Sequence, residues 1–226
     1  MAAVISRNDP AFDEALLDRA SVAFGVFDGV HEGHRFIIGE AVNTAREEGR
    51  ASAVITFDID PDEVFAADRL KKLMTNEARI AKLAELDVDA VVVLPFSREF
   101  AAQSPEDFLN ACFGGGVPSH IHIGSDFHFG RKASGNVKSL RVWGAERGME
   151  VHGHELVAEG GRPVTATRIR GLLSEGRARE EGRASAVITF DIDPDEVFAA
   201  DRLKKLMTNE ARIAKLAELD VDAVVV

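Results

Sequence analysis

Apolar and polar positions alternate in long blocks over residues 1–177. Five blocks are apolar or alternating and rich in Val and Ile, which predicts strands at residues 22–27, 51–57, 90–94, 120–124 and 150–156. Amphipathic or well-capped blocks between them predict helices at residues 34–48, 76–86, 137–147 and 168–175, and a further helix that starts at Ser104. This alternation predicts an α/β fold with a parallel sheet, helices on both faces, and ligands at the carboxyl ends of the strands.

A perfect internal repeat interrupts this pattern. Residues 45–93 and 178–226 are identical at all 49 positions. Repeat architectures contain drifted copies that lie next to each other along the chain, so a single perfect copy far downstream favours a recent recombination or an assembly artefact. We therefore expect one domain over residues 1–177, followed by a non-functional fragment over residues 178–226.

The two copies compete for one position in the predicted sheet. The segment Ala184–Phe190 has the same sequence as the predicted strand Ala51–Phe57. The first copy has short connections on both sides, so we expect it to occupy the sheet and the second copy to be loosely attached. Its apolar end, Val224–Val226, could then promote swapping, so we expect a monomer or a weak oligomer.

Composition excludes several classes of partner. The formal net charge of −11 disfavours nucleic acid, and no apolar run approaches the roughly 20 residues that span a membrane. Residues 1–20 lack a basic start followed by an apolar stretch, and the single cysteine, Cys112, excludes an intrachain disulfide. These features predict a cytoplasmic protein that contacts neither a membrane nor nucleic acid.

The run from Gly25 to His34 joins a predicted strand to a predicted helix. Its glycines allow a ligand to approach the backbone, and the start of the helix directs free N–H groups toward the same place. His31 and His34 are three residues apart, so both rings can reach one spot at the first helical turn and donate hydrogen bonds to phosphate oxygens. The run therefore predicts an anion site.

A second phosphate-binding element is predicted at the last helix. Thr165 and Thr167 provide hydroxyl groups, and Arg168 and Arg170 provide permanent positive charge with planar geometry. A plain capped helix would explain the same residues if the element stood alone.

The motif G-x-F-D-G-x-H-x-G-H resembles the signature of the FMN adenylyltransferase module of bacterial bifunctional riboflavin kinase/FAD synthetases, within the HxGH nucleotidylyltransferase superfamily. The similarity continues through Thr56–Pro61, Leu73–Thr75, Ile123–Gly130 and Thr165–Arg170. It implies a Rossmann-like nucleotidylyltransferase fold and the reaction of FMN with ATP, with Mg²⁺, to give FAD and pyrophosphate.

The resemblance also implies roles for individual residues. The catalytic residues would be His31, His34 and Arg170. The ATP-binding residues would be Gly25, Phe27, Asp28, Gly29, Gly33, Thr165, Thr167 and Arg168. The residues that contact flavin or ribose would be Phe57, Asp58, Asp126, Phe127 and Gly130. No carboxylate is distinctive enough to be assigned to the metal.

The sequence departs from the family pattern in three places. Ile59 and Asp60 replace a proline and a histidine of a stretch often written F-x-P-H-P, and Ala166 replaces a hydroxyl residue. The repeated fragment stands where the family normally has a riboflavin kinase domain, so we expect that domain and its activity to be absent.

Two other functions remain open from the sequence. HxGH is shared by cytidylyltransferases and by adenylyltransferases with other phosphate acceptors, and the chain could also bind a flavin or nucleotide without turnover. The pairs His120–His122 and His152–His154 have the spacing of metal ligands on a strand, but no third ligand is evident for either pair. We therefore expect these histidines to be structural or at the surface.

Overall fold

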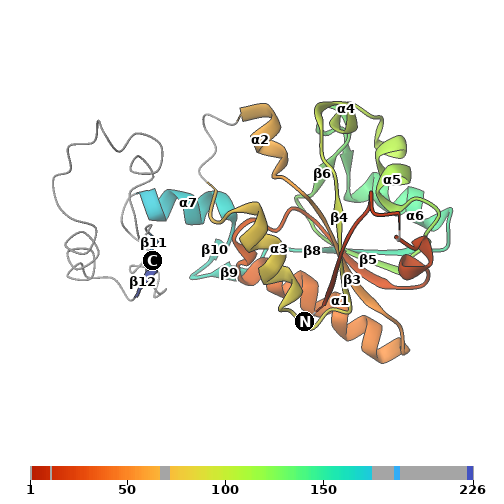
Figure 1. Cartoon of the computed structure of the whole chain (residues 1–226), viewed down its shortest axis with the longest axis horizontal. Coiled ribbons are helices and arrows are strands. Elements are labelled where there is room, and N and C mark those ends of the chain that lie inside the picture. The colour runs from red at the N-terminus through yellow and green to blue at the C-terminus, as the bar shows by residue number, and fades with distance from the viewer. Residues whose placement is uncertain (1, 11, 67–71, 175–185, 189–222, 226) are drawn as a thin grey trace. The chain divides into compact units, whose positions relative to one another are not determined.

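The computed structural model describes residues 2–10, 12–66, 72–174, 186–188 and 223–225 (Figure 1). The chain divides into two compact units, Met1–Arg170 and Gly171–Val226. Each is described below by itself.

The first unit contains a six-stranded sheet. Its strands, in spatial order, are β1 (Ala3–Ser6), β4 (Ala90–Leu94), β3 (Ser52–Phe57), β2 (Ser21–Phe24), β5 (His120–Gly124) and β8 (Glu150–His154). All neighbours in this sheet are parallel. From β2 the chain order runs outward through β3 and β4 on one side and through β5 and β8 on the other, so the topological switch lies between β2 and β5. Parallel sheets of this kind bind ligands outside the carboxyl ends of the strands at that switch.

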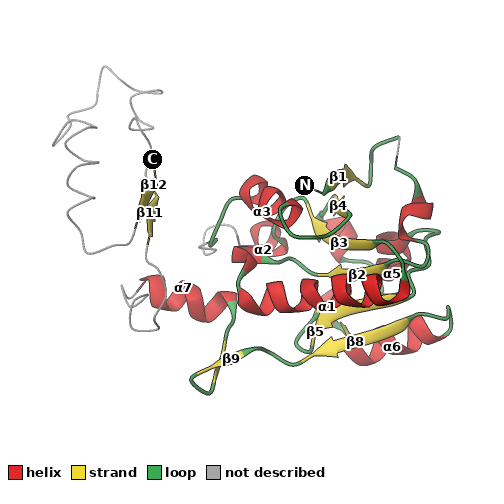
Figure 2. Ribbon diagram, turned by 90° about the horizontal axis from the view of Figure 1, so that it is seen from below, coloured by secondary structure: helices red, strands yellow, loops and turns green. Residues whose placement is uncertain are grey.

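Helices cover both faces of the sheet, as predicted. On one face, Ile55 and Ile121 pack with residues of α5 (Pro105–Phe113) and α6 (Val137–Ala145). On the other face, Ala23 and Val54 pack with residues of α1 (Glu32–Glu48) and α3 (Asn76–Ala84). Figure 1 shows these two helix pairs on opposite sides of the strands, and Figure 2 shows α1 running along β2 and β5. The buried strands are apolar on both faces because each face is covered.

The remaining elements are short. They are α2 (Pro61–Ala66), α4 (Arg98–Ala101), α7 (Ala166–Ser174), the pair β6 (His128–Phe129) and β7 (Gly135–Asn136), and the pair β9 (Ala158–Glu159) and β10 (Arg162–Pro163). Side-chain caps start several helices, including Thr75 at α3 and Ser104 at α5, which the sequence predicted. No described helix is long and apolar enough to cross a membrane.

Sequence analysis missed strand β1 and misplaced the end of β2. Strand β1 was missed because it is only four residues long and mostly exposed. The strand predicted at residues 22–27 ends at Phe24, because Phe27 has a left-handed backbone conformation that no strand accommodates.

The second unit contains one described strand pair. Strand β11 (Ala186–Ile188) pairs in parallel with β12 (Ala223–Val225), with Ala186 opposite Ala223. In the first copy the equivalent residues Ala53 and Ala90 are also partners. The first copy thus occupies the six-stranded sheet, as expected. The structure describes only residues 186–188 and 223–225 of the fragment, so its loose attachment and the exposure of its end remain predictions.

Candidate active site

A cleft of about 490 Å³ opens at the carboxyl ends of β2 and β5, at the topological switch. Residues from three distant parts of the chain line this cleft. It lies at the carboxyl ends of the strands, where the sequence predicted ligands to bind. Among the residues predicted for ATP or catalysis, those on the wall are Gly25, Phe27, Asp28, His31, Gly33, His34, Thr165 and Thr167. Asp126 and Phe127, predicted to contact flavin or ribose, also line this cleft.

The two histidines lie together at the start of α1. His31 is the N-cap residue and His34 lies in the first turn, so their rings stack at a centroid distance of 3.5 Å with 23° between planes. Burial, with a smaller contribution from His31, lowers the pKa of His34 to about 3. The His34 ring is therefore neutral at pH 7. Within the described residues, its buried Nδ1 has no hydrogen-bond partner, which is unusual for a buried polar atom.

The loop between β2 and α1 is held in an unusual conformation. Phe27, Gly29 and Val30 all have positive φ, at 61°, 78° and 38°. Such conformations cost about 1–3 kcal/mol each in residues other than glycine, and they gather at functional sites. A Cβ on Gly33 would lie 3.2 Å from Cε1 of His31, so glycine at this position leaves room for the stacked ring.

Asp28 connects this loop to two other parts of the chain. Its buried carboxylate accepts a hydrogen bond from the Leu73 N–H at 3.2 Å and forms an ion pair with Nη2 of Arg170 at 2.6 Å. The pair brings a cation of α7 beside the loop between β2 and α1, although Arg170 itself does not line the cleft. The buried Nε of Arg170 has no hydrogen-bond partner.

The second predicted phosphate element is only partly at the cleft. Thr165 caps α7, since its hydroxyl accepts a hydrogen bond from the Arg168 N–H at 3.1 Å. The Arg168 guanidinium instead donates to the carbonyls of Arg162 and Pro163 at 3.4 and 3.3 Å. Neither Arg168 nor Gly29 lines the cleft.

An aromatic cavity of about 610 Å³ adjoins the cleft. Phe57, Phe127 and Gly130, three of the residues predicted to contact flavin, line it. The cavity and the cleft share a wall formed by Val26, Pro61, Asp62, Phe127 and His128. A flat ring in the apolar cavity would therefore lie next to a phosphate in the cleft.

Comparison with known proteins agrees with this geometry. The family model described as FAD synthetase matches residues 13–168 and 173–226. Among curated proteins, the bifunctional riboflavin kinase/FMN adenylyltransferase of Listeria monocytogenes is 32% identical over 161 residues, which cover 70% of this chain and 51% of that protein. The protein of the same name from Escherichia coli K12 is 30% identical over 68% of this chain and 50% of its own length. The chain belongs to the FAD synthetase family.

The chain spans about half the length of these curated relatives. A crystal structure of a macrolide-efflux protein from Streptococcus pneumoniae aligns with a TM-score of 0.65 over 85% of this chain and 67% of that one. At 22% identity this likeness shows a shared fold.

Asp58, expected to contact flavin or ribose, and its neighbour Asp60 make hydrogen bonds to the backbone around the end of β3. The Asp58 carboxylate accepts hydrogen bonds from the N–H groups of Ile59 and Phe96, both at 2.8 Å, and it lines neither cavity. Asp60 is buried and accepts from the N–H of Asp62 at 2.9 Å, which caps α2. Burial raises the pKa of the Asp60 carboxyl. Both side chains support the loop after β3.

Sequence analysis missed Arg79, whose hydrogen bonds hold the ends of β2 and β3 next to the cleft. Its buried guanidinium donates to the carbonyls of Val26 and Phe57, at 2.7 and 2.8 Å, and to the Thr56 hydroxyl at 2.7 Å. These acceptors lie where β2 and β3 end. The only sequence signal is a polar residue four positions before Leu83, on the buried side of α3.

Proposed function

We propose that this chain is an FMN adenylyltransferase that converts FMN and ATP to FAD and pyrophosphate. The observation that carries the proposal is the shared wall between the histidine-lined cleft and the aromatic cavity. The cleft would hold the ATP phosphates, and the cavity would hold the flavin ring. Family membership supports the same reaction.

The reaction needs no nucleophilic side chain. The FMN phosphate has a second pKa near 6, so it is largely a dianion at pH 7. One of its oxygens attacks the α-phosphorus of ATP, and the bond between the α-phosphorus and the bridging oxygen breaks as pyrophosphate leaves. The protein must align these groups and stabilise the negative charge that develops on the leaving group.

His31 and His34 are the central residues of this proposal. The neutral ring of His34 stabilises phosphate oxygens through a hydrogen bond, since its lowered pKa keeps it uncharged in the free protein. The backbone at Gly25 and Gly33 lets the nucleotide approach closely.

Arg170 would act on the β- and γ-phosphates together with Thr165 and Thr167. It now pairs with Asp28, so phosphate oxygens would compete with that carboxylate for the guanidinium. Arg168 adds charge near α7 without facing the cleft.

Mg²⁺ would enter with ATP and offset the negative charge of its phosphates. Hard oxygen ligands are available at the cleft from Asp28, Asp62, Asp126 and Glu155, which fits such an ion. We also expect the protein to act in the cytoplasm, because ATP is the nucleotide donor in the proposed reaction.

The test is FAD formation by the full chain, measured by chromatography with FMN, ATP and Mg²⁺. Competition with pantetheine phosphate and glycerol phosphate reports acceptor choice. FAD as the only dinucleotide product is the expected result. If the folded chain forms no FAD but transfers a nucleotide to another acceptor, the activity belongs to a different HxGH enzyme. Tight FMN binding without turnover would identify a binding protein.

A further inference from the structure

Two histidine pairs lie on the neighbouring strands β5 and β8, and of their four members only His154 lines the cleft of the proposed active site. The register places His120 opposite Glu150 and His122 opposite His152, so the two pairs form one row on the same face. From the sequence, neither pair had an evident third ligand. The strand pairing places Glu150 near one histidine of each pair, His120 and His152, so the fold supplies a third candidate ligand.

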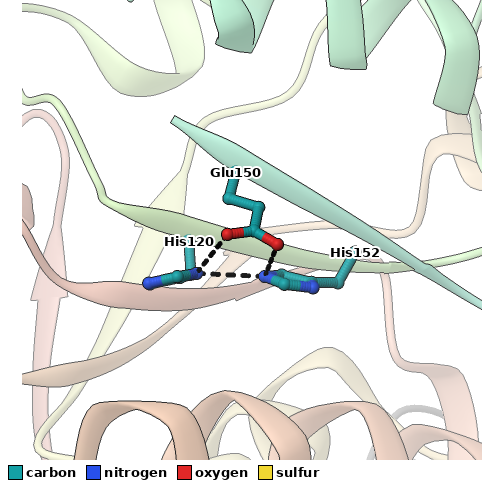
Figure 3. A group of neighbouring side chains, drawn as sticks. All are labelled: His120, Glu150 and His152. Atoms are coloured by element: carbon teal, nitrogen blue, oxygen red, sulfur yellow. Dashed lines mark hydrogen bonds and ion pairs between the residues drawn. The ribbon is translucent and has the colours of Figure 1, made fainter. Parts of the chain in front are cut away.

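We propose that His120, His152 and Glu150 form a binding site for Zn²⁺. Figure 3 shows the carboxylate of Glu150 between the two rings, with one nitrogen of each ring turned toward it. The ligand atoms all lie within 4.8 Å of one another. The site is independent of the proposed reaction, because none of these residues lines the cleft or the aromatic cavity.

The distances are close to those of a tetrahedral zinc site. Zn–N bonds of about 2.0–2.1 Å imply about 3.3 Å between two nitrogen ligands. Nδ1 of His120 and Nε2 of His152 are 3.0 Å apart. The Glu150 oxygens lie 4.0 Å from the first nitrogen and 3.8 Å from the second, so a small rotation of this carboxylate would complete three ligands. The Glu150 side chain is 69% exposed and free to make that rotation.

A second carboxylate orients the His120 ring. Nε2 of His120 lies 3.0 Å from Oε1 of Glu48, and Glu48 is itself held by Nε of Arg50 at 2.8 Å. A ring that donates its Nε2 proton to a carboxylate keeps a lone pair on Nδ1, which faces the proposed metal position. This carboxylate–histidine arrangement is the usual support of a zinc ligand.

Metal binding would replace the proton that now lies between the two rings. In the metal-free protein, one of the two facing nitrogens must carry a proton to make the 3.0 Å contact. With Nδ1 of His120 unprotonated, that proton is on Nε2 of His152. It would move to the other nitrogen of the same ring, so the ring stays neutral and no net proton is lost. A solvent molecule would fill the fourth position.

The other facing histidines make a weaker case. Nδ1 of His122 and Nε2 of His154 are 2.9 Å apart, and His31 stacks on His34. Within the described residues, only the set with Glu150 gathers three ligand atoms. Those two histidine pairs therefore serve as the internal comparison for the experiment.

The first test is stoichiometry and affinity on the full chain. The protein is stripped with a chelator and titrated with Zn²⁺ against a chromophoric competitor. We expect one tightly bound Zn²⁺ per chain, and Co²⁺ should give the intense visible absorption of tetrahedral coordination. At a free Zn²⁺ concentration of 100 times the Kd, the melting temperature should rise by roughly 5–10 °C, because the metal joins β5 to the edge strand β8.

Variants locate the site. His120→Ala and His152→Ala should abolish tight binding, and Glu150→Gln should weaken it by at least about tenfold. Glu146→Gln is the matched control, since its side chain is 68% exposed and lies outside the cluster. Because Glu150 is at the surface, Glu150→Gln keeps the test valid even if a histidine variant fails to fold.

Three results would overturn the proposal. The first is the absence of tight Zn²⁺ binding by the folded protein. The second is binding that survives Glu150→Gln and both histidine variants. The third is binding that is lost instead in His34→Ala or His154→Ala while Glu150→Gln binds normally. FAD formation is measured separately, so these results do not depend on it.

Discussion

The same 49-residue sequence occurs in two environments in this chain. In the first copy, β3 lies between β2 and β4, and β4 is also paired with β1. In the second copy, the described strands β11 and β12 pair with each other in the same register, Ala186 with Ala223 as Ala53 with Ala90. The repeated sequence therefore specifies this strand pairing wherever it occurs.

The functional site needs more than that pairing. The stacked histidines, the left-handed loop and the aromatic wall around Phe127 come from residues outside the repeat. The repeat contributes supports, such as Arg79, which holds the carbonyl of Val26 in the loop after β2. The same strand pairing therefore occurs in both copies, whereas the candidate site depends on contacts between the first copy and residues outside the repeat.

The largest expected effect is at a residue that the second copy lacks. His34→Ala should lower kcat by about 100- to 1000-fold, because it removes one hydrogen-bond donor from the transition state. No histidine occurs after residue 154, so nothing in the second copy can replace it. Steady-state FAD formation measures the loss, with thermal melting as the control for folding. A loss below about threefold in a folded variant would remove His34 from the mechanism.

The next prediction compares one substitution in both copies. Arg79→Ala should lower the free energy of unfolding by about 3 kcal/mol, because it leaves a cavity and three buried acceptors without their donor. Arg212→Ala, in identical local sequence, should cost less than about 0.5 kcal/mol. Guanidinium denaturation measures both. Equal losses from the two variants would contradict the view that the first copy alone supports the site.

Acid should weaken the first unit selectively. Burial lowers the pKa of His34 and of His122 to about 3, below the unfolded value of 6.5. The unfolded chain therefore binds more protons as the pH falls below 6.5, and stability is lost between that pH and about 3. We expect a loss of about 2 kcal/mol for each ring between pH 7 and pH 5, which is on the order of 4 kcal/mol for the two together.

Denaturation curves across this pH range test that expectation. All seven histidines precede the second copy, so a chain ending at residue 177 should show the same pH dependence. Stability that stays constant or rises as the pH falls would show that these rings are accessible to protons in the folded state.

The smallest effect should come from removal of the second copy. A chain ending at residue 177 should form FAD within about twofold of the full chain, since every residue of the proposed site precedes that position. FAD formation by the shortened chain alone would instead show that the second copy interferes with the first.

Much of the fold was predictable because its signals are local. Buried strands such as β4 are continuous apolar runs, and helix starts such as Ser104 and Thr75 carry their own caps. The end of β2 was not predictable, since Phe27 adopts a left-handed conformation that its residue type disfavours. Strand β1 was missed because four mostly exposed residues give too weak a pattern.

The sequence by itself determined the parallel α/β order, the histidine motif at a strand–helix junction, and the family. These depend on spacing along the chain, which periodicity and helix caps reveal. Only the tertiary structure decided that Arg170 pairs with Asp28, that Arg79 donates to the carbonyl of Val26, and that Glu150 lies beside His120 and His152. Each of these contacts joins residues that are brought together by packing and strand register. None of the three contacts can therefore be predicted from a single segment of the sequence.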